Sequence, residues 1–250
     1  MTELTSDQRP DAHKLVEEQR SKLGLVPAWS YSRLKSFEEC PYKVYISSVK
    51  KIQEPQGEAA ARGEAVHKDG ELFIIGKTEN LTKDYAHFDA DMRRAKQMFT
   101  DGKAEVEGEW GFTIDWQPTG WMAGDCWARI KLDLLAFESE TSALVVDFKT
   151  GKKIGNEIAH KQQGLLYAIG TFMRFPDIEF VTCEFWYLDQ KEKMKTSYTR
   201  AEALKWLPAF TRRGMLLTTC TDWKPTPSPS SCRWCTYGKG ENPECRFAVT

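Results

Sequence analysis

Two aspartates and a lysine have the types and spacing needed for hydrolytic chemistry. Asp147 and Lys149 follow the short β-branched run 144–146, which is typical of a buried strand, and Asp133 ends a similar run fourteen residues earlier. Because strand side chains alternate, Asp147 and Lys149 should point to the same side of a sheet. If the two runs pair as a hairpin, both carboxylates can bind one divalent cation, while Lys149 positions water or stabilises negative charge. This combination predicts metal-assisted hydrolysis of a phosphodiester.

An Asp-x-Lys sequence at a strand end is also compatible with a solvated pair of surface charges, so other motifs must decide between the two interpretations. Five further motifs accompany it. Each is weak by itself, but their joint occurrence in one order is informative. They are the segment 30–34 (SYSRL) followed by 37–42 (FEECPY), the G-x-x-x-H of 63–67, Asp133, the Q-x-x-x-Y of 163–167, and the C-x-x-C of 232–235 with Cys245.

In these motifs and their order, the chain resembles the RecB-type branch of the PD-(D/E)xK nucleases. It is most similar to the iron–sulfur group of that branch, which includes the AddB nuclease domain and the CRISPR-associated exonucleases. The resemblance implies an α/β fold with a restriction-endonuclease-like α/β/α core and a mixed sheet. It also implies a cysteine-ligated metal-cluster segment that joins the N- and C-terminal parts. One departure is that Ile130 and Lys131 occupy positions where the family usually has glycine.

The resemblance assigns a role to each polar motif. It implies that Mg²⁺ or Mn²⁺ is bound by His67, Asp133, Asp147 and the backbone carbonyl of Phe148. The implied catalytic residues are Asp133, Asp147, Lys149, Gln163 and Tyr167.

The residues alone leave alternatives open for several of these positions. A lone helical histidine such as His67 is more often a packing or surface residue. Gln163 and Tyr167 lie on one helical face, where they could contact the DNA backbone, hold Lys149, or simply form a polar face. Glu107 and Glu109 lie on the polar side of their predicted strand, and the sequence does not select either for the site.

The cysteines suggest a second metal centre. Two residues between Cys232 and Cys235 allow both sulfur atoms to reach one centre, and Cys40 and Cys245 complete four thiolates. The resemblance implies a [4Fe–4S] cluster, and structural zinc is the chemical rival. Such a centre would tie together the two ends of the nuclease core. The other three cysteines are predicted to be buried, inert thiols. They are Cys126, Cys183 and Cys220.

The amino-acid composition limits the classes of protein to which the chain can belong. The 250 residues are 41% apolar, which is enough for a substantial core, and the formal net charge is −1. An end-acting nuclease with this charge needs a local basic channel. Seven cysteines argue against a disulfide framework. No run approaches the length of a membrane span, and the polar N-terminus lacks the apolar centre of a signal peptide. We therefore expect a soluble, cytoplasmic protein of a prokaryotic cell or phage-infected host.

Hydrophobic periodicity predicts the order of the elements. We expect a flexible lead at 1–28, with a short helix near 11–23, then the nuclease core at 29–224 and the cysteine segment at 225–250. Within the core, the first predicted helix is capped by Ser30 or Ser32 and ends near Pro41, and the second covers 58–75. The third is opened by Thr82 or Asp84, the fourth covers 156–174, and the fifth is opened by the capping box at 199–202. The predicted strands are 106–116, 127–137, 143–149, and a hairpin of 178–188 with 193–199.

The leading hypothesis is a metal-dependent DNA exonuclease acting on ends in recombination, repair or CRISPR-type DNA processing. Its expected partner is single-stranded DNA or duplex DNA with free ends. The sequence does not decide whether the chain forms a homo-oligomer. No nucleotide is expected, because Gly76-Lys77-Thr78 has Glu71 where a phosphate-binding loop needs its first glycine. The alternatives are a non-catalytic DNA-binding or scaffold module with a structural metal, and an endonuclease of the same fold.

Overall fold

The computed structural model describes residues 23–54, 57–239 and 243–249. Most of the predicted N-terminal lead and almost all of the helix predicted near 11–23 lie outside the described residues. The chain divides into two compact units. The first comprises Met1–Pro55, Gly111–Arg129 and Thr211–Thr250, and the second comprises Gln56–Trp110 and Ile130–Phe210. The candidate catalytic residues all belong to the second unit.

The described residues form a mixed sheet of seven strands with the order β3-β2-β4-β5-β6-β7, and β1 pairs with β4. The β4–β5 pair is antiparallel, with Leu134 opposite Val146, so the predicted hairpin is confirmed. Strands β5 and β6 are parallel and are connected through helix α6 (Glu157–Arg174). The strands are β1 (Trp29–Ser30), β2 (Ala104–Phe112), β3 (Pro118–Thr119), β4 (Ala128–Phe137), β5 (Ser142–Lys149), β6 (Phe180–Tyr187) and β7 (Glu192–Thr199).

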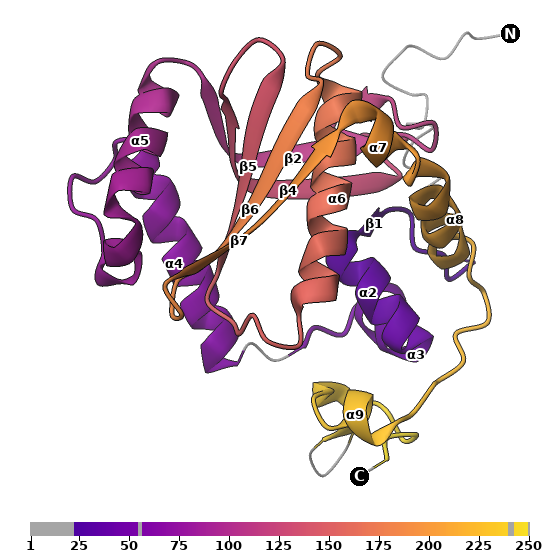
Figure 1. The fold of residues 1–250 in the computed structure, drawn as a ribbon. Coiled ribbons are helices and arrows are strands. Elements are labelled where there is room, and N and C mark those ends of the chain that lie inside the picture. The colour runs from indigo at the N-terminus through magenta and orange to yellow at the C-terminus, as the bar shows by residue number, and fades with distance from the viewer. Residues whose placement is uncertain (1–22, 55–56, 240–242, 250) are drawn as a thin grey trace, which may run out of the picture. The chain divides into compact units, whose positions relative to one another are not determined.

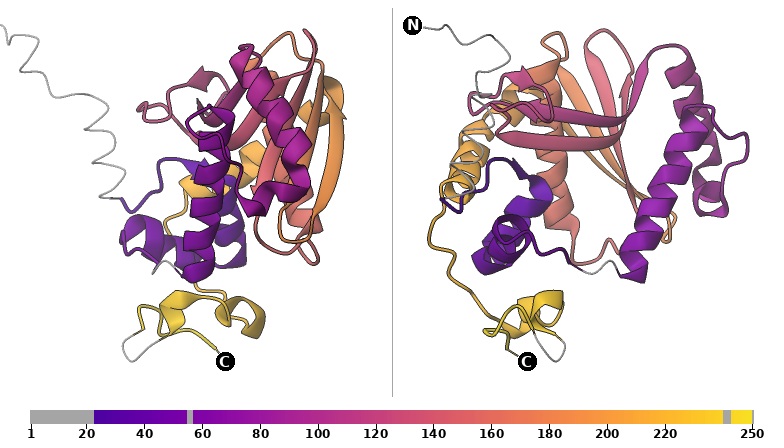
Figure 2. Two further views of the ribbon diagram at one scale, coloured as in Figure 1. Left: turned by 90° about the vertical axis from the view of Figure 1, so that its left-hand side faces the viewer. Right: turned by 180° about the vertical axis from the view of Figure 1, so that it is seen from behind.

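In the second unit, helices cover both faces of the sheet. Helices α4 (Glu58–Ile74) and α5 (Asp89–Thr100) lie on one face, and α6 lies on the other (Figures 1 and 2). The core beneath α4 and α5 is built from their apolar side chains and from alternate residues of the strands, such as Val146 and Phe148. The α/β class and the mixed sheet are therefore confirmed, and the layers are consistent with a restriction-endonuclease-like core.

Local sequence signals explain how the key elements begin and end. The predicted capping box at 199–202 is present: Thr199 and Glu202 bond reciprocally at the start of α7 (Arg200–Leu204). Proline at position 208 stands at the start of α8 (Leu207–Thr218), where its missing N–H is harmless. The helix predicted from Thr82 begins as a 3₁₀ turn, Lys83–Phe88, and becomes α5 only at Asp89.

The strand predicted at 106–116 was too long. Strand β2 ends at Phe112, and Trp116 lies in a turn with φ +61° and is 2% exposed. The alternation also fails inside β2, where Glu107 has φ +52° and Trp110, Gly111 and Phe112 are all buried. On α6, the apolar residue Ile158 is 76% exposed.

The first unit joins the start of the described chain to its C-terminal segment. Ser30 caps α2 (Tyr31–Glu39), as predicted, and α2 is followed by α3 (Pro41–Val44) and the π-helical turn Tyr45–Val49. The C-terminal part contains α9 (Pro229–Cys232) and the 3₁₀ turn Thr236–Gly238. Thr226 Oγ1 donates to the carbonyl of Glu39, and Tyr237 Oη donates to that of Ile52, both at 2.9 Å. Within the described residues, no helix has the length and apolar character needed to cross a bilayer.

Candidate metal centre and catalytic residues

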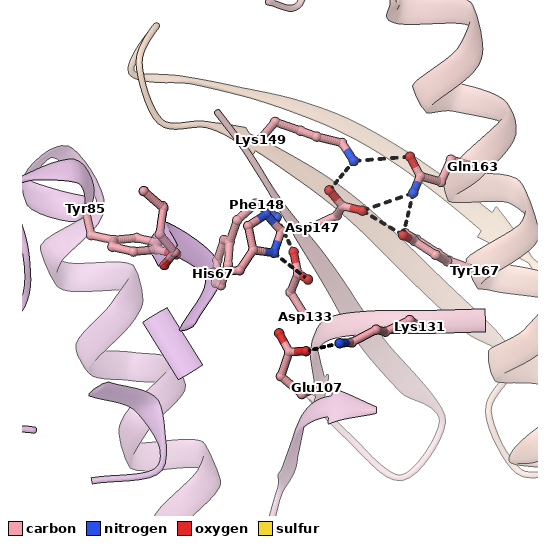
Figure 3. Close-up of polar contacts among 11 residues, drawn as sticks. His67, Tyr85, Glu107, Lys131, Asp133, Asp147, Phe148, Lys149, Gln163 and Tyr167 are labelled. Atoms are coloured by element: carbon pink, nitrogen blue, oxygen red, sulfur yellow. Dashed lines mark hydrogen bonds and ion pairs between the residues drawn. The ribbon is translucent and has the colours of Figure 1, made fainter. Parts of the chain in front are cut away.

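Asp147 and Lys149 occupy the end of β5 and form an ion pair. Lys149 Nζ lies 2.6 Å from Asp147 Oδ2, so the two side chains share one side of the sheet, as predicted (Figure 3). The Asp147 residue is only 5% exposed, and its Oδ2 accepts no hydrogen bond. A buried carboxylate oxygen whose partner is a single ammonium group has capacity left for another cation.

Helix α6 holds the other oxygen of this carboxylate. Tyr167 Oη donates to Asp147 Oδ1 at 2.6 Å, and Gln163 Nε2 donates to the same oxygen at 3.2 Å. Gln163 Oε1 accepts from Lys149 Nζ at 3.3 Å (Figure 3). Burial raises the pKa of Tyr167 well above its ordinary value, and the negative charge of Asp147 raises it further. The hydroxyl therefore remains a donor. The i,i+4 pair therefore orients Asp147 and Lys149 from the facing helix.

Asp133 is the second buried carboxylate, at 9% exposure. Its Oδ2 accepts from the backbone N–H of Phe148 at 2.6 Å, and its Oδ1 lies 3.0 Å from Nδ1 of His67 on α4. Burial raises the pKa of Asp133, and the negative charge of Asp147 raises it further. The hydrogen bond to His67 acts in the opposite direction and lowers the pKa of Asp133. Burial lowers the pKa of His67, but its hydrogen bond to Asp133 and the nearby carboxylate charges leave the pKa above its ordinary value.

Glu107 is the site residue that the sequence did not identify. His67, Glu107 and Asp133 each contribute a ligand-type atom, and these atoms all lie within 4.8 Å of one another. It is the one such group of three or more among the described residues. The sequence feature that could have indicated Glu107 is Gly108. A glycine within a strand pattern often marks a bulge that redirects neighbouring side chains. Glu107 Oε2 also pairs with Lys131 Nζ at 2.8 Å (Figure 3).

The His67–Glu107–Asp133 group fits a divalent metal ion. Two adjacent ligands of an octahedral Mg²⁺ ion, each about 2.1 Å from it, lie about 3 Å apart. The distance between His67 Nδ1 and Asp133 Oδ1 is 3.0 Å. The two carboxylates supply the hard oxygen donors that suit Mg²⁺ or Mn²⁺, and His67 adds an imidazole nitrogen. Asp147 does not belong to this tight group, although its charge influences Asp133.

The four cysteines predicted to bind a cluster line one cavity of about 350 Å³ in the first unit. They are Cys40, Cys232, Cys235 and Cys245, and each is partly buried and free of a disulfide. No three of their sulfur atoms lie within 4.8 Å of one another, so the structure does not show an assembled cluster of cysteine ligands.

The remaining cysteines are not all alike. Cys126 and Cys183 are buried, as predicted, and burial raises the pKa of Cys183 well above its ordinary value. Cys220 is only partly buried, which corrects the prediction. It lies just after α8, between the exposed residues Thr219 and Thr221.

Comparisons with known proteins place this geometry in a family. The model of the PD-(D/E)XK nuclease superfamily matches residues 28–239. A search of curated proteins found no significant match. Among solved structures, the chain is similar to SSO0001, with 15% identity, a TM-score of 0.41, and coverage of 94% of this chain and 98% of that one. It is also similar to LHK-Exo in complex with dAMP, with 16% identity, a TM-score of 0.34, and coverage of 79% and 92%.

Proposed function

We propose that this chain, which belongs to the PD-(D/E)XK nuclease superfamily, is a Mg²⁺- or Mn²⁺-dependent exonuclease that hydrolyses phosphodiester bonds at DNA ends. The superfamily implies a nucleic acid substrate. The observation that carries the proposal is the placement of the His67–Glu107–Asp133 group beside the buried Asp147–Lys149 pair. This places a metal-binding donor set next to a positioned ammonium group, which is the equipment for phosphodiester hydrolysis.

Each residue has a separate task in this proposal. His67, Glu107 and Asp133 hold the metal ion, and Asp147 Oδ2 and the carbonyl of Phe148 are further ligands. When bound, the ion supplies Lewis-acid activation of the phosphate and of a water molecule. The backbone N–H of Phe148 fixes the orientation of Asp133 through its 2.6 Å hydrogen bond. Asp147 Oδ2 is buried and its one partner is the Lys149 ammonium group, which supports its assignment as a ligand.

Lys149 acts on the phosphate and on the attacking water. Its ammonium group can donate to a non-bridging phosphate oxygen, where negative charge increases in the transition state. Gln163 accepts a hydrogen bond from Lys149 while donating to Asp147, so it fixes the distance between the two charged groups. Tyr167 holds Asp147 from the same helix. Because both residues contact the catalytic pair itself, we assign them to positioning rather than to the DNA backbone.

The action on ends rests on the sequence motifs shared with exonucleases, as do the expected roles in recombination, repair or CRISPR-type processing. An endonuclease of the same fold would use the same residues, so the substrate must distinguish the two activities. A non-catalytic DNA-binding module is disfavoured by the complete hydrogen-bond network around Asp147, because a decayed site has no need of an aligned lysine, glutamine and tyrosine.

For the cysteine segment at 225–250, we propose a [4Fe–4S] cluster bound by Cys40, Cys232, Cys235 and Cys245, bracing the nuclease core at 29–224. The donor set is four thiols around one cavity, which suits either iron–sulfur or zinc. A single tetrahedral zinc ion at 2.3 Å would bring its sulfur ligands to within about 3.8 Å of one another. No three of the four sulfur atoms lie within 4.8 Å of one another, so the choice of the iron–sulfur cluster rests on the resemblance of the motifs.

The test is cleavage of end-labelled single- and double-stranded DNA, and of circular single-stranded DNA, by anaerobically purified protein in Mn²⁺ or Mg²⁺. We expect the wild type to degrade linear DNA and leave circles intact, and Asp147→Ala and Lys149→Ala to be inactive but folded. Asp177→Ala and Lys205→Ala, which remove exposed charges of the same kinds in the second unit, are the matched controls.

The possible results separate the hypotheses. Cleavage of circles would identify an endonuclease. DNA binding without turnover in either metal would favour the binding module. Full activity in both site variants would contradict the assignment of Asp147 and Lys149.

A further inference from the structure

Glu107 is contacted by a resident cation at the place where a divalent ion would bind. Lys131 lies on β4, two residues before Asp133, and its Nζ is 2.8 Å from Glu107 Oε2. The Glu107 carboxylate also belongs to the group with His67 and Asp133. An ammonium group thus already contacts a carboxylate that a divalent ion would use (Figure 3).

The backbone holds Glu107 in this position. Its φ of +52° is uncommon for a residue with a Cβ atom, and it interrupts the alternation of side chains along β2. Strained conformations of this kind persist only where the surrounding structure determines them, and they concentrate at functional sites. The Glu107 side chain is 23% exposed, which is intermediate between that of Asp133 at 11% and that of Lys131 at 51%.

Lys131 stands at the edge of an open groove next to the candidate metal centre. The groove has a volume of about 470 Å³ and is lined by one face of α4 together with Glu107 and Lys131. The other lysine in this groove, Lys68, is paired with Glu71 of the same helix at 2.7 Å. Lys131 is therefore the groove cation that directly contacts the candidate ligand group.

We propose that Lys131 pairs with Glu107 in the metal-free protein and is displaced when a divalent cation binds. The released ammonium group of Lys131 then binds a DNA phosphate next to the scissile one. This inference rests on the proposed function. A half-exposed ion pair is weak, whereas a divalent ion can be shared by several ligands at once. Mutual repulsion between the charges of Asp133 and Asp147 also favours the extra positive charge. Metal binding thus releases an ammonium group at the edge of the groove, where a phosphate can approach.

The first experiment measures Mn²⁺ affinity by electron paramagnetic resonance titration, without DNA. Removal of a competing cation by Lys131→Met should raise Mn²⁺ affinity roughly two- to fivefold, the factor that corresponds to a half-exposed ion pair. Glu107→Gln should lower it about tenfold, because a charged oxygen ligand is lost. Lys205→Met, which replaces an exposed lysine of the same unit, should leave the Mn²⁺ affinity unchanged. Weaker or unchanged Mn²⁺ binding by Lys131→Met would overturn the proposed exchange.

The second experiment measures binding of a fluorescent single-stranded oligonucleotide in Ca²⁺ and in EDTA. In Ca²⁺, Lys131→Met should bind DNA more weakly than wild type, and its salt-dependence slope should be smaller by about 0.7, the loss of one phosphate contact. In EDTA the two proteins should bind equally. Equal loss in both conditions, or no loss in either, would overturn the metal-dependent release. Absence of DNA cleavage by the wild type would instead refute the proposed function, and the Mn²⁺ titration would still report on the exchange.

Discussion

Replacement of Tyr167 by phenylalanine tests whether α6 positions the carboxylate of Asp147 for the proposed reaction. Tyr167 is 5% exposed, and its hydroxyl donates to Asp147 Oδ1 and accepts from Gln163 Nε2, both at 2.6 Å. The substitution removes one oxygen atom and keeps the packed ring. Gln163 still donates to Asp147, and Lys149 still neutralises it. The change therefore removes the hydrogen bond to the buried charge of Asp147, together with the bond that Gln163 donates to the same hydroxyl.

The magnitude follows from the kind of bond that is lost. A hydrogen bond to a charged group contributes about 1.5–3 kcal/mol. We expect the free energy of unfolding to fall by about that amount, which corresponds to roughly 4–9 °C in melting temperature for a chain of this size. Since the bond exists both before and during the reaction, only the part that maintains alignment affects the rate. We therefore expect kcat to fall about tenfold, which corresponds to about 1.4 kcal/mol in the barrier.

The assay separates positioning from direct contact with DNA. Urea unfolding gives the stability change, and steady-state cleavage of an end-labelled oligonucleotide gives kcat and KM separately. A positioning role predicts a lower kcat with an unchanged KM, accompanied by lower stability. A raised KM with wild-type stability would refute the reasoning, because it would mean that the hydroxyl contacts the substrate instead of Asp147.

Two further predictions concern the other parts of the molecule. Cys232→Ser should lose iron and acid-labile sulfide and melt at a lower temperature, since a ligand that closes a long loop is removed. Equal metal content and melting temperature in the two proteins would argue against any metal in this segment. Gly70→Ala should destabilise the protein by about 1–3 kcal/mol in urea, because the added Cβ would overlap the hydroxyl of Tyr85. Gly120→Ala, whose Cβ would meet only ordinary contacts, is the control, and equal stability of the two variants would contradict the packing around α4.

Features that depend on local periodicity could be predicted from the sequence. Asp147 and Lys149 lie on one side of the sheet because strand side chains alternate, and Gln163 and Tyr167 lie on one face of α6 because residues four apart share a helical face. The hairpin that brings β4 against β5 was predictable from two apolar runs separated by a short polar turn. These relations span few residues and follow from backbone geometry alone.

The rest of the site depends on tertiary structure. Glu107 reaches His67 and Asp133 through a left-handed backbone conformation, and alternation along the strand predicts nothing about where such a residue points. Similarly, the sequence treated Asp133 and Asp147 as equivalent ligands. The structure separates them, because α4 provides the partner of one and α6 provides the partners of the other. Which helix faces which carboxylate is decided by packing across the sheet.

Each of the three carboxylates in and beside the candidate metal centre is matched by a basic side chain. Each one has its own partner: Lys149 for Asp147, Lys131 for Glu107, and His67 for Asp133. An unpaired buried carboxylate would be costly, so these partners allow the fold to form before metal is present. A divalent ion must then compete with these basic side chains for the carboxylates. Metal affinity in this site is therefore set by the strength of the pairs it replaces as well as by the ligands themselves, and the most exposed pair, Lys131–Glu107, is the one that a metal ion can displace at the lowest cost.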